Sequence, residues 1–189
     1  GEILIKGPQV MQGYYKDPEQ TAEVLKNGYF HTGDIGEIDS DGFLKITDRK
    51  KSMFKTSGGK YVAPQLIENA MKQSSFIEQI LVVGDGEKMP AALIQPNWEW
   101  IKQWSSIKGN DISLDTAVAC KDEKLISRIQ QEIDFHNEGF GNWEKVKTFQ
   151  LTPDVWSIEA GHLTPTMKSK RKVIKEMYKD LYEKLYGRS

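Results

Sequence analysis

The sequence has very little cysteine, because Cys120 is the only one among 189 residues. A single thiol cannot form an internal disulfide, and with three scattered histidines it makes no Cys/His metal site. We therefore expect no metal site in this chain. No apolar run approaches the length of a membrane span, and no basic-then-apolar signal segment opens the chain. These absences predict a soluble, cytoplasmic protein and leave peripheral membrane association open.

Charge is nearly balanced overall but unevenly distributed. The chain has 26 basic and 27 acidic residues, for a net charge of -1. Residues 164–189 hold eight of the basic residues and only three of the acidic ones. A basic end on an acidic body predicts an anionic partner near that end. Nucleic acid, a membrane surface and a phosphate-bearing small molecule all fit this pattern.

The patterning divides the chain into a small β-rich part and an α+β part of about 140 residues. Residues 1–48 contain short strands such as EILIK and FLKIT, joined by turns at NG and DSDG. The sequence opens on GEILIKG with no leader, so we expect it to belong to something longer. The second part spans 49–189, and residues 52–186 are expected to form a closed core. If residues 1–48 are the end of something longer, Ile3, Ile5 and Phe30 are expected to be poorly buried.

One expected helix opens at Pro64 and runs to 72, and a longer one from 121 has Leu125, Ile129 and Ile133 at intervals of four. Further helices are expected around the tryptophan-rich segment 97–104 and over 170–186, and strands at 79–84, 91–96 and 144–151.

Two local patterns in the second part are specific. Ser57, Gly58 and Gly59 separate two short apolar segments, which predicts a glycine-turned hairpin. In the final helix we expect one buried stripe. The stripe consists of Ile174, Met177, Leu181 and Leu185, and the tyrosines Tyr178, Tyr182 and Tyr186 are interpreted as a packed face.

Four segments carry a resemblance to a known family. They are GEILIKGPQVMQGYYKDPEQTAE, GYFHTGDIG, DRKKSMFKTSGGKYVAPQLIE and LTPTMKSKRKVI. In order and spacing they resemble the acyl-adenylate-forming enzymes, and most of all the long-chain fatty acyl-CoA synthetases. The resemblance implies that residues 1–48 are the end of a large adenylate-binding domain. It also implies that 49–189 are the mobile C-terminal domain, with a hinge near 48–51.

In this family the phosphate-binding loop and most of the acyl pocket lie upstream of the segment seen here. The chain therefore resembles the C-terminal third of a synthetase, and we expect it to be inactive alone. The resemblance implies ATP, Mg²⁺ and CoA as cofactors and a fatty acid as substrate, with the ATP and Mg²⁺ sites largely outside this chain.

Nucleotide binding is assigned to three residues. Asp34 follows Thr32 and a glycine, and a short carboxylate on a tight turn can accept two hydrogen bonds, as the vicinal hydroxyls of a ribose require. By resemblance Asp34 matches the aspartate that binds the ribose of AMP. The planar donors of Arg49 suit a ribose oxygen or a phosphate. His31, beside them, is interpreted as a packing or hydrogen-bonding residue.

Lys168 is the predicted catalytic residue. When a carboxylate attacks the α-phosphate of ATP, negative charge accumulates in the transition state, and a mobile ammonium group can neutralise it. By resemblance Lys168 matches the adenylation lysine, with Lys170 as a rival, and Arg171 matches a basic residue three positions on. Many relatives have glycine where this chain has Met167.

The second half-reaction joins the acyl group to a thiol. The resemblance implies that the C-terminal domain turns about Lys51, the hinge residue, between the two half-reactions. In the orientation that forms the thioester, Lys55, Gly58 and Gly59 would face the active site. The glycines would let the pantetheine arm of CoA pass close to the backbone. Cys120 is rejected as an acyl carrier, because its surroundings in sequence offer no base or oxyanion donors.

Two alternatives stay open. The first is another acyl- or aryl-CoA synthetase of the same superfamily, since the acyl pocket is not in the sequence. The second is a non-catalytic basic module that binds anionic lipid or nucleic acid through residues 167–188. The acidic body and the helical spacing of the tail tyrosines argue against a nucleic acid partner. Oligomeric state is not indicated.

Overall fold

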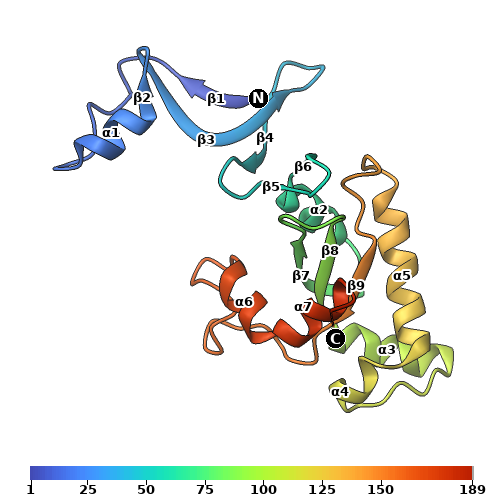
Figure 1. Cartoon of the computed structure of the whole chain (residues 1–189). Coiled ribbons are helices and arrows are strands. Elements are labelled where there is room, and N and C mark those ends of the chain that lie inside the picture. The colour runs from blue at the N-terminus through green and yellow to red at the C-terminus, as the bar shows by residue number, and fades with distance from the viewer. Residues whose placement is uncertain (189) are drawn as a thin grey trace. The chain divides into compact units, whose positions relative to one another are not determined.

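The computed structural model describes residues 1–188, except for the side chains of Asp48 and Lys108. It separates into two compact units, residues 1–53 and the part that begins at Phe54 (Figure 1). The mixture of helices and strands confirms the α+β class. The boundary predicted after residue 48 and the hinge at 48–51 stay predictions.

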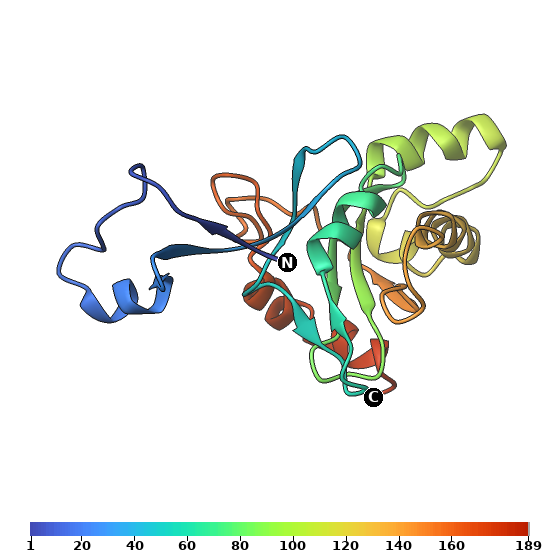
Figure 2. The ribbon, with the colours of Figure 1, turned by 90° about the horizontal axis from the view of Figure 1, so that it is seen from above.

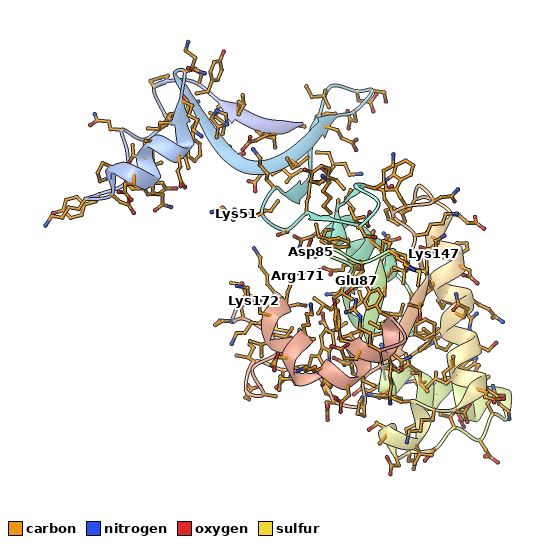
Figure 3. All side chains as sticks on the ribbon, viewed as in Figure 1. Lys51, Asp85, Glu87, Lys147, Arg171 and Lys172 are labelled. Carbon is orange, nitrogen blue, oxygen red and sulfur yellow. The ribbon has the colours of Figure 1, made fainter. Side chains whose placement is uncertain are left out.

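The first unit is a four-stranded antiparallel sheet with one short helix. Strand β3 pairs with β1, β2 and β4, and its ladder with β4 shifts register between Ile35 and Gly36. Asn27 and Gly28 both have positive φ, which is the two-residue turn that joins β2 to β3. A turn after β4 holds Lys51 (Figure 3). The elements are β1 (Glu2–Ile5), α1 (Pro18–Val24), β2 (Leu25–Lys26), β3 (Tyr29–Ile38) and β4 (Leu44–Arg49).

The first unit buries almost nothing. Gly36 is its only buried residue among those described, and Ile38 and Phe43 are 73% and 71% exposed. A folded sheet normally covers one apolar face. This sheet therefore has no core of its own.

The second unit is built on a three-stranded sheet with helices on both faces. β7 pairs antiparallel with β8, and β8 pairs parallel with β9, so β7 and β9 are the outer strands. Viewed from above, α5 lies on one side of this sheet and α6 on the other (Figure 2). The elements are β5 (Phe54–Lys55), β6 (Tyr61–Val62), α2 (Pro64–Met71), β7 (Ile77–Val83), β8 (Ala91–Pro96), α3 (Trp98–Lys108), α4 (Thr116–Ala119), α5 (Glu123–Asn137), β9 (Thr148–Leu151), α6 (Arg171–Met177) and α7 (Lys179–Leu185).

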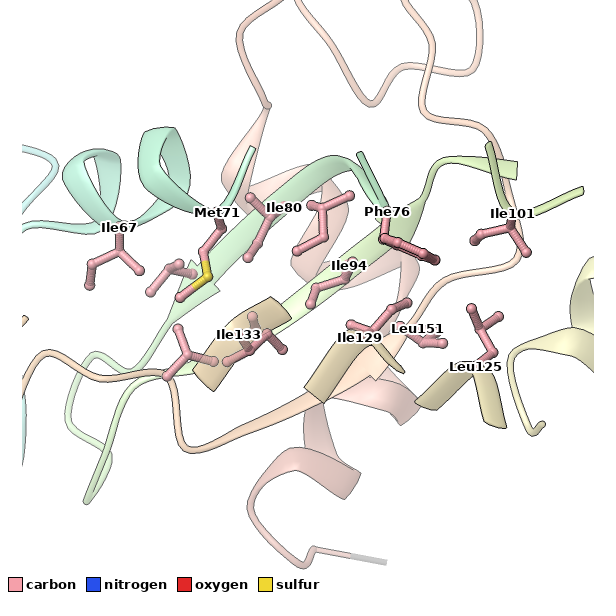
Figure 4. Packing of buried hydrophobic residues seen from close by; sticks show 14 of the residues in the cluster. Ile67, Met71, Phe76, Ile80, Ile94, Ile101, Leu125, Ile129, Ile133 and Leu151 are labelled. Carbon is pink, nitrogen blue, oxygen red and sulfur yellow. The ribbon is translucent and has the colours of Figure 1, made fainter. Parts of the chain in front are cut away.

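Alternation along β7 divides the core between the two faces. Ile80 and Val82 join the cluster covered by α2, α3 and α5 (Figure 4), whereas Leu81 and Val83 join the cluster covered by α6 and α7. Side chains on one strand point alternately to opposite faces, so one strand supplies both cores. In the first cluster α5 contributes Leu125, Ile129 and Ile133, as their spacing predicted.

Most predicted elements are confirmed, with end corrections. Asn97 and Asp122 cap α3 and α5, each accepting hydrogen bonds from backbone N–H groups of the first turn. The strand expected at 144–151 is shorter, because Glu144 N and Lys145 N donate to Gly141 O in a turn and β9 begins at Thr148. The short helix α4 was not predicted.

The prediction of one continuous helix over 170–186 is wrong. It breaks at Tyr178, where φ is -109° and ψ is 37°, and α7 starts at the next residue. The buried stripe shifts accordingly: Met177 is 51% exposed, whereas Tyr178 and Tyr182 are 8% and 5% exposed. The two buried tyrosines agree with the packed face inferred from their spacing. In the part of the chain that the structure describes, no helix has the length and apolarity needed to span a membrane.

Candidate functional site

The three predicted nucleotide-binding residues meet on the first unit. Asp34 on β3 is the ladder partner of Arg49 on β4, and Arg49 Nε donates to Asp34 Oδ1 at 2.9 Å. Thr32 Oγ1 donates to the Ile3 carbonyl at 2.8 Å and accepts from Asp34 N at 3.0 Å. Gly33 between them has φ +73°, which glycine adopts without strain. The carboxylate is thus fixed on a rigid strand, and its side chain is 25% exposed.

A second charged group lies next to this one and was missed by sequence reasoning. Glu2 Oε2 accepts from Lys50 Nζ at 2.9 Å and contacts His31 Nδ1 at 3.4 Å. The hydrogen bond from Lys50 lowers the pKa of Glu2, and partial burial opposes that shift. The contact gives His31 the hydrogen-bonding role that the sequence suggested. The sequence offered little sign of this role, since Glu2 is simply the first residue of the opening strand, β1.

Lys51 lies in a turn closed by the main chain. Ser52 N and Met53 N both donate to the Arg49 carbonyl, and the Lys51 side chain is exposed. Its role as a hinge residue stays a prediction.

The predicted glycine-turned hairpin is β5–β6 of the second unit. Phe54 pairs with Val62 and Lys55 with Tyr61, and the Lys55 ammonium lies 5.5 Å from the centre of the Tyr61 ring. Gly59 has φ +80°, so the turn itself requires glycine there.

Position 58 differs from position 59. A Cβ at Gly58 would meet only Thr56 Oγ1, at 3.9 Å, which is ordinary van der Waals contact. Local packing therefore does not require glycine at position 58, and its role beside CoA stays a prediction.

Lys168 lies at the end of a tight hairpin loop in the second unit. Leu163 and Ser169 form an isolated bridge, and Thr164 N donates to the Lys168 carbonyl at 2.8 Å. The three-residue loop ends at Met167, whose φ is +60°. Loops of this length commonly place a residue, most often glycine, in the left-handed region at this point. The Lys168 side chain is exposed, and Thr164 Oγ1 accepts from its N–H at 3.0 Å.

A buried hydrogen-bond chain supports the upstream arm of this hairpin. His162 is 2% exposed, and its Nε2 lies 3.1 Å from Tyr178 Oη, which donates to Asp154 Oδ2 at 2.9 Å. Because the tyrosine proton goes to the carboxylate, His162 Nε2 donates to Oη and Nδ1 accepts from Ser157 N at 3.4 Å. This arrangement requires a neutral imidazole. Burial lowers the pKa of His162, and the Asp154 charge opposes that shift.

An ion pair supports the downstream arm. Arg171 Nη1 donates to Glu68 Oε1 at 2.6 Å, and Nη2 donates to the Val82 carbonyl. Burial raises the pKa of Glu68, while the charge of Arg171 opposes the shift. The sequence pointed to Arg171 but not to its partner. A glutamate directly after Ile67 on the packed side of α2 was the available signal, since charged residues are rarely buried without a partner.

Cys120 has little capacity to act as a nucleophile. Burial, and after it the negative charge of Asp154, raises the pKa of this thiol to about 12. Thiolate, not thiol, is the reactive form. Across residues 1–188 no group of three or more His, Cys, Asp or Glu side chains is arranged to hold a metal ion.

Comparison with known proteins gives consistent matches. Residues 52–189 match a family model described as the AMP-binding enzyme C-terminal domain. Fatty acyl-CoA synthetase B of Dictyostelium discoideum is 39% identical over 100% of this chain and 28% of its own length. Human long-chain-fatty-acid–CoA ligase 1 is 39% identical over 99% of this chain and 27% of its own length. The chain thus spans between a quarter and a third of the relatives it matches.

Two solved structures resemble the fold. The adenylation domain of a carboxylate reductase from Mycobacterium chelonae has a TM-score of 0.77 and 28% identity, over 98% of this chain and 27% of that one. The corresponding domain of a carboxylic acid reductase from Segniliparus rugosus, solved with AMP and a carboxylic acid, has a TM-score of 0.76 and 29% identity, over 98% and 28%.

Proposed function

Because the chain belongs to the family of AMP-binding enzyme C-terminal domains, we propose that the protein it is part of is an ATP-dependent long-chain fatty acid:CoA ligase. One observation carries the proposal. Two relatives with fatty acyl-CoA synthetase or ligase names are 39% identical over 99–100% of the chain, across both of its units.

The proposed reaction has two steps. In the first, a fatty acid carboxylate oxygen attacks the α-phosphorus of ATP, the bond to the β-phosphate oxygen breaks, and pyrophosphate leaves. In the second, the CoA sulfur attacks the acyl carbon of the adenylate, the thiol proton is lost, and AMP leaves. The sum is acyl-CoA, AMP and pyrophosphate.

Lys168 serves the first step in this proposal. Its ammonium group neutralises the charge that accumulates on the phosphate oxygens in the transition state. The exposed side chain on a hairpin supported from both arms fits a group that must be both reachable and placed.

Asp34, Thr32 and Arg49 bind the nucleotide. The Asp34 carboxylate accepts hydrogen bonds from the ribose hydroxyls. Arg49 donates to a ribose oxygen or a phosphate, and its 2.9 Å bond to Asp34 Oδ1 keeps the two side chains together. Thr32 stabilises the strand on which Asp34 lies, through its bonds to Ile3 and Asp34 N.

In this proposal the second unit takes a different orientation for the second step. Lys51 is the proposed hinge, and Lys55, Gly58 and Gly59 border the path of the CoA pantetheine arm. As the resemblance implies, Mg²⁺ would accompany ATP at groups largely outside this chain. We also propose that the chain is inactive without the rest of the protein.

The test separates the two steps in the full-length protein. Lys168→Ala should slow ATP–pyrophosphate exchange by about 10²-fold or more, because a preorganised charge is lost. Conversion of supplied acyl-adenylate and CoA to acyl-CoA should be nearly unchanged. Lys170→Ala is the matched control and should leave both steps intact. Equal losses in both steps for Lys168→Ala, or a selective loss for Lys170→Ala, would refute the assignment.

The similarity to two carboxylate-activating domains of reductases supports a broader second candidate, an acyl- or aryl-CoA synthetase with another acid substrate. A panel of fatty and aromatic acids, assayed by pyrophosphate release from the full-length protein, decides between them. Fatty acids of long chain should give the highest kcat/KM.

A further inference from the structure

Arg171 stands where it can control the position of Lys168. It is the first residue of α6, and only two residues separate it from Lys168. Both of these are tied to the other arm of the hairpin: Ser169 bridges Leu163, and Lys170 N donates to the His162 carbonyl at 2.8 Å. A displacement of Arg171 is therefore transmitted to Lys168 through the main chain.

The guanidinium group is fastened to two places on the body of the second unit. Its two terminal nitrogens bond Glu68 Oε1 and the Val82 carbonyl, from the start of α6 (Figure 3). Glu68 is 8% exposed, and the same Oε1 accepts from Val82 N at 2.8 Å. Val82 of β7, Glu68 of α2 and Arg171 of α6 are thus each hydrogen-bonded to the other two.

Stability alone does not account for this pair. Withdrawing two charges from water costs about as much as their attraction returns, so apolar side chains of similar volume hold two elements together equally well. Apolar contacts do not fix a direction, however. A planar fork that engages a carboxylate and a carbonyl sets both the rotation and the register of the helix start.

We propose that Glu68 and Arg171 are positioning residues for the adenylation step. They hold the start of α6, and through it the ammonium group of Lys168, in the orientation that the reaction requires. The inference rests on the role proposed above for Lys168. Neither residue touches the reacting atoms, and neither serves the thioester-forming step, which proceeds without Lys168.

The experiment measures both half-reactions of the full-length protein. The double variant Glu68→Met with Arg171→Met removes the pair without leaving one buried charge alone. We expect adenylation to fall about tenfold or more, since small misplacements of a catalytic group have effects of this size. Thioester formation from supplied acyl-adenylate should change less than about twofold. The control is Glu87→Met with Arg188→Met, which removes another Arg–Glu pair of this unit, 2.7 Å apart, and should alter neither step.

A second comparison shows whether the pair acts through Lys168. Added to Lys168→Ala, the double variant should reduce adenylation little further, because there is no ammonium group left to position. Full additivity, or equal losses in both half-reactions, would overturn the inference. A normal Lys168→Ala enzyme would instead refute the proposed role of Lys168, and the inference with it. A defective Lys168→Ala beside an unaffected double variant would refute only the inference.

Discussion

At the scale of single residues, Met167 holds a backbone conformation that side chains with a Cβ disfavour. Its φ of +60° costs about 1–2 kcal/mol relative to the right-handed region. Glycine escapes that strain but loses about 0.5–1 kcal/mol of backbone entropy. Met167→Gly should therefore raise the free energy of unfolding of the second unit by up to about 1 kcal/mol. Urea titration of the chain measures this, and a variant less stable than the parent would contradict it.

His162 gives stability a pH dependence of known sign. Its pKa in the folded protein lies below the ordinary value of 6.5, so the unfolded chain binds more protons between the two values. The stabilisation is complete above about pH 6.5 and is lost as the pH falls toward the lowered pKa. Among the described residues, the titratable groups that share this buried set of hydrogen bonds with His162 are Tyr178 and Asp154.

The measurement is urea unfolding between about pH 7 and pH 5. The wild-type chain should lose more stability over this interval than His162→Gln, in which the titrating group is gone. Parallel curves for wild type and His162→Gln would contradict the prediction.

At the scale of elements, the residue at the break between α6 and α7 carries a hydroxyl that bonds two other parts of the chain. Tyr178 Oη joins His162 and Asp154, from positions 16 and 24 residues earlier in the chain. Tyr178→Phe keeps the ring but leaves His162 Nε2 and Asp154 without this partner, which should cost about 1–3 kcal/mol of stability. Tyr186→Phe is the milder comparison, because the Tyr186 hydroxyl donates one long hydrogen bond, to the Met89 carbonyl at 3.3 Å. Equal stability of the two variants would argue against the chain of bonds.

How far elements could be predicted follows from how local their causes are. The bounds of α2 and the stripe of α5 followed from Pro64 and from apolar spacing, which act within a few residues. The break at Tyr178 did not follow, and the side-chain partners of Tyr178 lie 16 and 24 residues earlier, beyond the reach of local spacing. The Glu68–Arg171 pair spans 103 residues, and no spacing rule connects two such positions. The resemblance assigned Asp34 and Arg49 to nucleotide binding, but it did not predict their direct contact, which the β3–β4 register brings about.

At the scale of the whole molecule, the two units differ in what holds them together. All buried apolar side chains of the described chain lie at or beyond Phe54. Ile5 is 36% exposed, and Ile3 and Phe30 are only half-buried, so the poor burial expected for these three is confirmed.

Separate expression of the units tests this difference. Residues 54–189 alone should unfold cooperatively with a urea midpoint close to that of the same unit in the full chain, because they contain both apolar clusters. Residues 1–53 alone should show no cooperative transition. A sigmoidal unfolding curve for the short piece would mean that its sheet is stable without a buried core.

The raised pKa of the Cys120 thiol has a practical consequence for labelling the two units with dyes. With a pKa of about 12, only about one molecule in 10⁵ carries the thiolate at neutral pH. Maleimide dyes react with the thiolate, so they should label Cys120 far more slowly than an exposed cysteine. New cysteines at the exposed positions Lys26 and Glu138, one in each unit, would take up a donor and an acceptor dye selectively. Energy transfer between the dyes would then record how the distance between the two units of this chain varies in solution.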